Sequence, residues 1–309
     1  MSVSAIELAQ MQGLPLHLKI IKTVARLSEF YDTYNGMVYC AFSGGMDSTI
    51  LADIIKRSGL NIPLVFCNTG NEYPDLVKFA LSKNPVVIRP EHSFKWVCEH
   101  YGFPVVSKEV SKNISRYRNT KSDLQKQLRL NGGICPASGK RQARGIPLKY
   151  HYLVDAPFKI SDMCCEIIKK RPFKKYDKES RRFPITAEIA DESIKRRFTY
   201  MKTGCNNYNS KIPKSMPMGF WKQQDVLAYA LAFDVKYAPT YGKIEYDPEK
   251  KILYTTKEKR TGCYNCMYGV QMEGHPNRFE RMKIEYPELY NVCMNQGCGM
   301  CMDFIRVAH

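Results

Sequence analysis

No continuous apolar run in this sequence approaches the roughly 18 residues that a membrane-spanning helix requires. Residues 1–20 lack the basic start and the apolar stretch of a secretion signal. Cysteine accounts for only 12 of 309 residues, well below the roughly 8 to 10% that marks a short disulfide scaffold. We therefore expect a soluble cytoplasmic protein without a membrane partner. In that reducing compartment, clustered cysteines indicate metal or redox chemistry rather than structural disulfides.

The chain is also not evenly charged. It carries 47 basic and 30 acidic residues, a formal net charge of +17. Residues 108–149 alone contain 11 basic and 2 acidic residues, whereas residues 1–107 contain 9 of each. This asymmetry favours a polyanionic partner, either a nucleotide with several phosphates or a nucleic acid such as tRNA or DNA. The alternative is a solvated basic surface.

Apolar periodicity predicts an α/β fold. Apolar residues spaced three and four apart over 6–34 predict one or two amphipathic helices. Short apolar runs at 37–42, 63–67 and 85–88 predict strands, and helical patterns follow the first two of them. Alternating strands and helices form a doubly wound parallel sheet, with ligands at the carboxyl ends of the strands.

Three regions follow from the composition along the chain. Residues 1–36 form an N-terminal helical segment, 37–235 a nucleotide-binding domain and 236–309 a cysteine-rich C-terminal extension. Within the domain, 108–149 is a basic excursion, and we expect its residues 113–145 to form a partly helical excursion or a mobile loop. A hairpin is expected around Tyr246-Asp247-Pro248-Glu249, and a helix over 221–233 packs on the sheet.

The first chemical motif is Ser43-Gly44-Gly45-Met46-Asp47-Ser48, which lies between the first predicted strand and its helix. Such a turn gathers free backbone N–H groups and the positive end of the helix dipole at one point, so it predicts an anion site. The glycines allow close approach of phosphate oxygens, and the two serines add hydroxyl donors. Asp47 would repel phosphate, so it either binds a cation such as Mg²⁺ or caps the helix.

This hexapeptide resembles the pyrophosphate-binding loop, or PP-loop, of the adenine nucleotide alpha-hydrolase-like superfamily. Within it, Thr69-Gly70-Asn71-Glu72 and Glu192-Ser193-x-x-Arg196 resemble motifs of the phosphoadenosine phosphosulfate (PAPS) reductase family, as does Pro217 to Val226. The resemblance implies that Thr69, Gly70 and Glu72 face the nucleotide and that Arg196 meets its anionic end. Met46 departs from the pattern, because many such loops carry lysine there.

The cysteines supply a second resemblance. Cys164-Cys165, with Lys169 four residues on, and Cys263-x-x-Cys266 are similar to the segments that hold a [4Fe-4S] cluster in cluster-bearing sulfonucleotide reductases. The resemblance implies that these four thiols are cluster ligands and that Lys169 belongs to the nucleotide site. The competing interpretation pairs Cys263 and Cys266 with Cys298 and Cys301 as a zinc ribbon.

The C-terminus departs from that family. Sulfonucleotide reductases end in Glu-Cys-Gly-Leu-His, whose cysteine attacks the sulfonyl sulfur, whereas this chain ends at Asp303 to His309 without that tail. Cys205 in Thr203-Gly204-Cys205 is one candidate for the attacking thiol, and Cys293, Cys298 and Cys301 are others. Cys205 and Asp47 are therefore the predicted catalytic residues.

Two enzymatic functions fit these motifs. The first is attack of a thiolate on the sulfur of PAPS or its unphosphorylated relative, with release of sulfite. The second is ATP-dependent sulfur transfer to nucleic acid with release of pyrophosphate. Either reaction would need a sulfur-donor or thiol-reductant protein as partner. A third hypothesis is a zinc-containing nucleic-acid-binding protein with a relic nucleotide site.

Overall fold

The computed structural model describes residues 2–134, 136, 139 and 144–309. Their contacts divide the chain into two compact units that interleave along the sequence. The first unit comprises Met1–Asn68, Glu72–Arg89 and Phe173–Thr261, and the second comprises Thr69–Asn71, Pro90–Pro172 and Gly262–His309. Each unit therefore combines segments that are far apart in the sequence.

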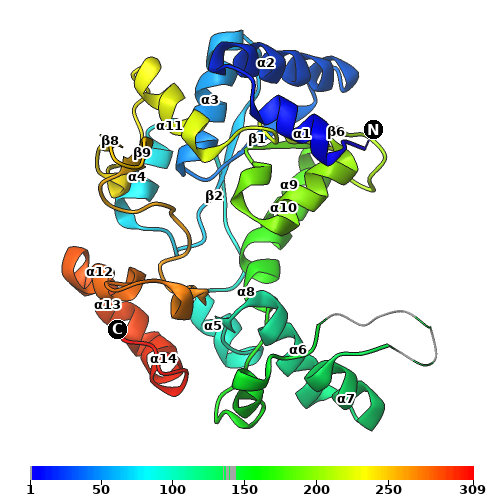
Figure 1. The fold of residues 1–309 in the computed structure, drawn as a ribbon, viewed down its shortest axis with the longest axis vertical. Coiled ribbons are helices and arrows are strands. Elements are labelled where there is room, and N and C mark those ends of the chain that lie inside the picture. Colours follow the sequence, from blue (N-terminus) through cyan, green and yellow to red (C-terminus); the bar gives the residue numbers. More distant parts are fainter. Residues whose placement is uncertain (1, 135, 137–138, 140–143) are drawn as a thin grey trace. The chain divides into compact units, whose positions relative to one another are not determined.

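A six-stranded sheet in the order β3-β2-β1-β5-β7-β6 forms the centre of the first unit, and Figure 1 labels its strands β1, β2 and β6. Every neighbouring pair is parallel except β6 and β7, which run antiparallel. The strands are β1 (Val38–Phe42), β2 (Leu64–Cys67), β3 (Val86–Ile88), β5 (Phe183–Thr186), β6 (Asn206–Asn207) and β7 (Lys214–Ser215). This mostly parallel α/β sheet confirms the predicted fold class, and β1, β2 and β3 confirm the three predicted strands.

Helices cover both faces of this sheet. On one face, the Tyr39 hydroxyl of β1 donates to Asp177 Oδ1 at 2.6 Å, and its ring stacks on Phe173 of α9. On the other face, Phe42 and Phe66 form a core with Ala80 of α4. The helices of this unit are α1 (Ala5–Gln12), α2 (Leu16–Thr33), α3 (Met46–Ser58), α4 (Pro74–Leu81), α9 (Arg171–Ser180), η3 (Ala190–Glu192), α10 (Ile194–Thr203), α11 (Gln223–Ala232) and η4 (Pro239–Tyr241).

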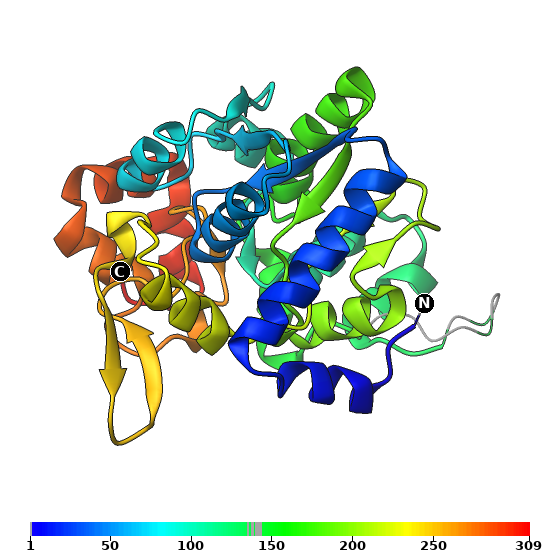
Figure 2. The same ribbon diagram turned by 90° about the horizontal axis from the view of Figure 1, so that it is seen from above.

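The predicted hairpin is also present. Strands β8 (Ile244–Asp247) and β9 (Ile252–Thr255) pair antiparallel outside the main sheet, and Figure 2 shows them in gold as a separate ribbon. The Gln224 side chain of α11 bonds Leu253 in both directions, because its Nε2 donates to the carbonyl and its Oε1 accepts from the amide. The hairpin is thereby fixed to a helix of the same unit.

The second unit is mainly helical. A short parallel pair, β4 (Val105–Val106) with β10 (Met267–Tyr268), joins its early and late segments. Its helices are α5 (Phe94–His100), α6 (Lys108–Asn119), α7 (Asp123–Asn131), η1 (Leu148–Asp155), α8 (Met163–Cys165), η2 (Glu166–Lys170), η5 (Val270–Met272), α12 (Arg278–Glu285), α13 (Pro287–Cys293), η6 (Met294–Cys298) and α14 (Gly299–Phe304). No helix among the described residues is long and apolar enough to cross a bilayer.

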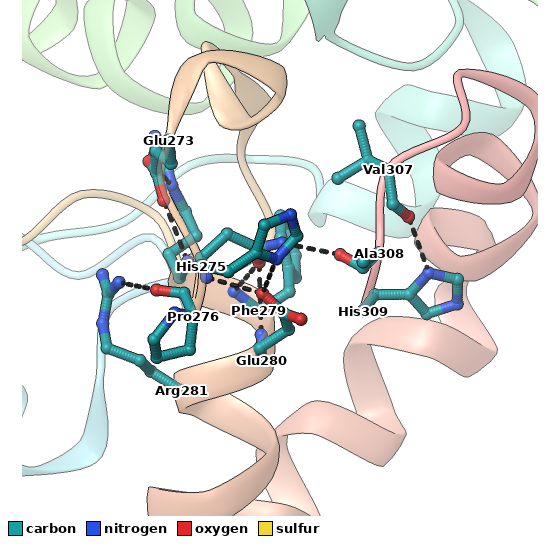
Figure 3. Close-up of polar contacts among 11 residues, drawn as sticks. Glu273, His275, Pro276, Phe279, Glu280, Arg281, Val307, Ala308 and His309 are labelled. Carbon is teal, nitrogen blue, oxygen red and sulfur yellow. Dashed lines mark hydrogen bonds and ion pairs between the residues drawn. The ribbon is translucent and has the colours of Figure 1, made fainter.

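A polar cap joins α12 to the last residues of the chain (Figure 3). The Asn277 Oδ1 atom accepts from the amides of Phe279 and Glu280, and Glu280 Oε2 accepts from the Asn277 amide in return. Asn277 Nδ2 donates to the Ala308 carbonyl at 2.7 Å. Because this reciprocal cap satisfies the first amides of α12, it fixes both the helix start and the residues that follow α14.

The basic excursion is partly helical, which was one of the two alternatives expected for it. Two helices, α6 and α7, occupy most of 108–131, where the polar sequence indicated a partly helical or mobile loop. Ser107 and Ser122 cap them by accepting from the amides of Val110 and Gln125. Residues 135, 137–138 and 140–143 of the excursion lie outside the described residues. Serine caps and a buried stripe on α6 explain the order, because the packing of a few apolar side chains outweighs the polar composition of the segment.

Candidate functional site

The predicted phosphate loop joins β1 to α3, and its backbone adopts a conformation that favours glycine. Gly44 has φ 72°, in the left-handed region that glycine enters without strain. A Cβ atom there would lie 3.1 Å from Leu76 Cδ2 and from Ala80 Cβ, so a side chain would also require these neighbours to shift. Gly45 is the N-cap residue of α3, and α3 begins at Met46. Asp47 lies in the first turn, so it is not the helix cap.

The loop lies where the strand order of the sheet reverses. From β1 the chain proceeds outward to β2 and β3, and β5 is later added on the opposite side of β1. The end of β1 is therefore the topological switch point of the sheet, and ligands of open α/β sheets bind at the carboxyl ends of strands at this point. The fold thus gives Ser43–Ser48 the position expected of a binding loop.

Hydroxyl groups surround Gly45. The Ser43 Oγ atom accepts from the Gly45 amide at 3.2 Å and lies 3.0 Å from Ser48 Oγ. The Met46 amide donates to the Tyr241 hydroxyl at 2.8 Å, and that hydroxyl also bonds Thr261 Oγ1 at 2.8 Å. A Cβ atom on Gly45 would lie 3.2 to 3.4 Å from the oxygens of Ser43, Tyr241 and Thr261.

Tyr241 and Thr261 were not expected at this loop. They lie some 200 residues beyond it, on η4 and just before the Cys263 segment, where the local pattern gave no sign of a nucleotide contact. Tyr241 is buried, and burial raises the pKa of its hydroxyl. The hydroxyl is therefore a neutral partner of the loop. It accepts the hydrogen bond of the Met46 amide, which is then not available to a phosphate oxygen.

Asp47 places a buried carboxylate beside the loop. Its Oδ1 atom is shielded from solvent and has no hydrogen-bond partner among the residues that the structure describes. Burial raises the pKa of Asp47, while the charges of Arg260 and Arg196 and a hydrogen bond from Gln223 act in the opposite direction. A buried acceptor without a partner is costly, so it marks a position that a cation or a ligand donor would stabilise.

Two arginines meet on one carboxylate next to Asp47. The Glu192 side chain pairs with Arg196 of α10, and it also accepts from Arg260 Nη1 at 3.2 Å. Ser193 caps α10 by accepting from the Arg196 amide, which fixes the start of the helix that carries this arginine. The predicted Arg196 thus lies in the same unit as the loop and contributes charge at Asp47. Arg260 is a second cation that the sequence motifs did not indicate.

The Thr69-Gly70 motif has a different neighbourhood. Thr69 Oγ1 accepts from the Asn71 amide at 3.2 Å, and the Asn71 carbonyl accepts from the Tyr264 amide at 2.8 Å. The Asn71 Oδ1 atom accepts from Asn265 Nδ2 at 2.8 Å. Residues 69–71 therefore belong to the second unit, with the turn that carries Cys263 and Cys266, whereas Glu72 is part of the first unit. Their role toward a nucleotide stays a prediction.

Four cysteines gather in the second unit. We call Cys164, Cys165, Cys263 and Cys266 the quartet. Burial raises the pKa of Cys164 most, and the other three thiols and Cys98 raise it further. Cys266 closes a turn by donating its amide to the Cys263 carbonyl at 3.1 Å. Burial raises the pKa of Cys266, and the charges of Arg278 and Lys169 oppose that shift only in part. The predicted Lys169 thus lies near the quartet.

The quartet does not have the arrangement of a single-ion site. Among the described residues, no three His, Cys, Asp or Glu side chains converge as the ligands of one metal ion. Tetrahedral zinc draws its sulfurs to about 3.8 Å from one another, as follows from a bond length near 2.3 Å. A cluster of several irons is wider, so its ligands stand further apart. The donor set of four thiols with two nearby cations is compatible with such a group.

Cys205 lies in an environment that suppresses its reactivity. It is buried in the first unit, and its Sγ atom lies 3.2 Å from the Tyr200 hydroxyl. Burial raises the pKa of the thiol, although the Tyr200 hydrogen bond lowers it in part. Because the thiolate is the nucleophile, this environment favours the unreactive form. Its catalytic role stays a prediction, and the structure gives it no support.

The basic excursion includes an arginine with a structural function. Arg118 donates to the carbonyls of Leu153, Val154, Ala156 and Phe158 at 2.7 to 2.9 Å. Burial lowers its pKa, and Asp155 opposes that shift. This guanidinium ties α6 to the end of η1 and to the residues that follow it, so its donors are already engaged. Lys112, Arg116 and Lys121 of the same stretch are at least partly exposed.

Comparisons with known proteins give a distant likeness. No family model matches the chain. It is 24% identical over 280 residues to an uncharacterized protein of Methanocaldococcus jannaschii, covering 89% of this chain and 51% of that protein. The chain thus spans about half the length of the curated relative. It is similar to the crystal structure of PAPS reductase from Candida auris in a phosphate complex, at 14% identity and a TM-score of 0.38, covering 77% of this chain and 91% of that one.

Proposed function

We propose that this chain is an enzyme that binds an adenine nucleotide at Ser43–Ser48 and performs sulfur chemistry. The observation that carries the proposal is the glycine loop at the switch point of the sheet, with the buried Asp47 carboxylate beside the charges of two arginines. Backbone amides and serine hydroxyls at such a loop suit phosphate oxygens. The adenine base and the sulfur chemistry rest on the motif resemblance.

Asp47 would hold Mg²⁺ when a polyphosphate is bound. A carboxylate alone repels phosphate, and its charge is already offset by Arg196 and Arg260. Since Mg²⁺ prefers one or two carboxylates together with phosphate oxygens, the cation would turn this repulsion into an attraction. The buried Oδ1 atom then gains the partner that it lacks among the described residues. This argument favours ATP with Mg²⁺ as the ligand.

The quartet would hold an iron-sulfur cluster. Its four thiols come from two segments of the second unit, and thiolates are the ligands that hold such clusters. Burial raises the pKa of Cys164 and of Cys266, and Arg278 and Lys169 oppose that shift at Cys266. When bound, such a cluster supplies electron transfer at a potential set by its surroundings. The chain's own contribution is to position the thiols and to shield them from water, as the burial of Cys164 illustrates.

Two reactions are compatible with this site. In sulfonucleotide reduction, a thiolate bonds to the sulfonyl sulfur and displaces the nucleotide phosphate. A second thiol then forms a disulfide with the first and releases sulfite. In ATP-dependent sulfur transfer, an acceptor oxygen attacks the alpha phosphorus and releases pyrophosphate. The terminal sulfur of a persulfide then displaces AMP, and a second thiol cleaves the resulting disulfide and leaves the sulfur on the acceptor. Asp47 favours the second reaction, because pyrophosphate with Mg²⁺ needs such a carboxylate.

The test separates binding from chemistry. Anaerobically purified protein is titrated with ATP, with and without Mg²⁺, and with PAPS, and the products are assayed as pyrophosphate and sulfite. Binding of ATP that requires Mg²⁺ in the wild type but not in Asp47→Asn would support the proposed role of the carboxylate. Asp191→Asn serves as a matched control, because this nearby aspartate accepts from the Gln223 amide and lies outside the loop. Absence of binding to either nucleotide would overturn the proposal.

A further inference from the structure

An apolar patch lies exposed on α10, whose opposite side is anchored in the first unit. Tyr200 is buried, and its hydroxyl lies 3.2 Å from Cys205 Sγ. Ile194 and Phe198, by contrast, are 76% and 66% exposed. Residues four apart on a helix are neighbours on its surface, so these two side chains form one patch. Among the described residues, the Phe198 ring stacks on no other ring, and its faces are open to a partner.

Cations flank this patch. Residues 193–204 contain four basic residues and no aspartate or glutamate. Lys195 and Lys202 lie three and four residues from Phe198, so both are neighbours of its ring on the helix surface. Lys195, Arg197 and Lys202 are exposed, and none of them forms an ion pair with the residues that the structure describes. The exposed face of α10 therefore presents uncompensated positive charge around an aromatic ring.

Side-chain contacts within the first unit join α10 to the phosphate loop. The Tyr241 hydroxyl accepts from an amide of the loop and bonds Thr261 Oγ1, and Arg260 directly precedes Thr261. Arg260 Nη1 donates to Glu192 at 3.2 Å, and Glu192 also pairs with Arg196 of α10. The exposed face of α10 therefore begins near the loop. From its first to its last exposed residue it spans about 12 Å, at a rise of about 1.5 Å per residue.

We propose that this face of α10 binds single-stranded nucleic acid, with an unpaired base stacked on Phe198 and backbone phosphates beside Lys195 and Lys202. Binding of single strands without sequence preference combines these two elements, an aromatic ring for the base and cations for the phosphates. An acidic protein surface would neutralise the cations but leave the ring exposed. A purely apolar partner would cover the ring but leave the lysines without counter-charges. The combination of exposed ring and excess positive charge therefore favours a polyanion that carries flat apolar groups.

Fluorescence anisotropy with a labelled oligouridine of about 12 nucleotides tests this surface. Phe198→Ala removes the stacking ring from an exposed position, so the fold should persist while the affinity falls about tenfold. Tyr246→Ala is the matched control, because this tyrosine is also exposed but lies on β8. Lys202→Gln should reduce the logarithmic salt dependence of binding by about 0.7, the value for one phosphate of a single strand. Lys56→Gln, at an exposed lysine in the last turn of α3, should change neither quantity.

This inference rests on the proposed function, because it identifies the acceptor of ATP-dependent sulfur transfer as nucleic acid and the surface that holds it near the loop. Calorimetric titration with ATP and Mg²⁺ separates the two. Phe198→Ala and Lys202→Gln should bind ATP as the wild type does, because both side chains lie on the exposed face of α10. A wild-type protein that binds oligouridine but neither ATP nor PAPS would support the surface and refute the nucleotide site. Binding of ATP without binding of oligouridine or oligothymidine at low salt would overturn the surface and retain the nucleotide site.

Three further results would overturn the proposed surface. The first is equal affinity of Phe198→Ala and wild type for oligouridine, because no base would then stack on the ring. The second is equally tight binding of a duplex of the same length, since a paired base within a duplex cannot stack on a side chain. The third is a wild-type dimer in sedimentation that Phe198→Ala dissociates, because a second copy of the chain would then cover the patch.

Discussion

Replacement of Tyr241 by phenylalanine tests whether the Tyr241 hydroxyl blocks a backbone amide of the loop. The Tyr241 hydroxyl accepts from the Met46 amide at 2.8 Å and bonds Thr261 at the same distance. A phosphate oxygen that binds this amide must displace the hydroxyl, because one N–H group makes one good hydrogen bond. Tyr241→Phe removes the competitor and keeps the buried ring.

The expected changes in stability and in nucleotide affinity follow from these two hydrogen bonds. The free protein loses both of them and leaves the Met46 amide without its partner at a buried position, which should lower the free energy of unfolding by about 1 to 3 kcal/mol. Nucleotide binding then satisfies that amide. A net gain of about 1 kcal/mol corresponds to an affinity about fivefold higher. Stability and affinity should therefore change in opposite directions.

Calorimetric titration with ATP and Mg²⁺, together with chemical denaturation, measures both quantities. Tyr237→Phe is the matched control, since its hydroxyl accepts from the Ile244 amide at 3.2 Å and its ring meets Tyr241 edge-on. The control should lose stability without binding more tightly. Weaker binding by Tyr241→Phe would refute the reasoning and would show that the hydroxyl itself contacts the nucleotide.

Three further predictions concern charge and metal. Burial raises the pKa of Asp47, so the folded state holds the Asp47 proton more tightly than the unfolded chain does. This difference adds to the free energy of unfolding in acid, and the added stability is lost as the pH rises through the raised pKa. The stability of Asp47→Asn relative to wild type should therefore increase from about pH 4 upward in denaturation experiments. Arg118→Gln should lower the free energy of unfolding by about 2 to 4 kcal/mol, because it removes hydrogen bonds to four carbonyls. Arg116→Gln should leave the free energy of unfolding unchanged. If the excursion binds nucleic acid, Arg116→Gln should also reduce the logarithmic salt dependence of binding to duplex DNA by about 0.9. Serine variants of the quartet should each lose bound iron, measured by iron and sulfide analysis, while Cys40→Ser should keep it.

The sequence predicted the parts of the fold that local patterns encode. Three strands bounded by turn residues were found where expected, because each is a short apolar run followed by a glycine, asparagine or proline signal. Strand β5 was missed, since its second residue is Pro184, which argues against a central strand. Its pairing with β7 involves Ile185 and not Pro184, so the missing amide costs nothing on that side.

The candidate site was predicted only in its contiguous part. Ser43 to Ser48 could be found because strand, turn and helix follow one another in the chain. Tyr241, Thr261 and Arg260 could not, because they meet the loop or its neighbouring charges only after the chain returns from a distant segment. The structural role of Arg118 could not be predicted either, because a side chain's hydrogen bonds to remote carbonyls leave no trace in charge counts.

The pairing of Asn71 with Asn265 affects how this chain can be divided. The two side chains are joined by a bond that spans 194 positions, and the Tyr264 amide reinforces it at the Asn71 carbonyl. A fragment that stops at Thr261 would deprive the Thr69–Asn71 segment of these partners. The cysteine-rich region thus cannot be removed without taking these partners from residues 69–71. Anyone grafting this region onto a related scaffold should transplant residues 69–71 along with it.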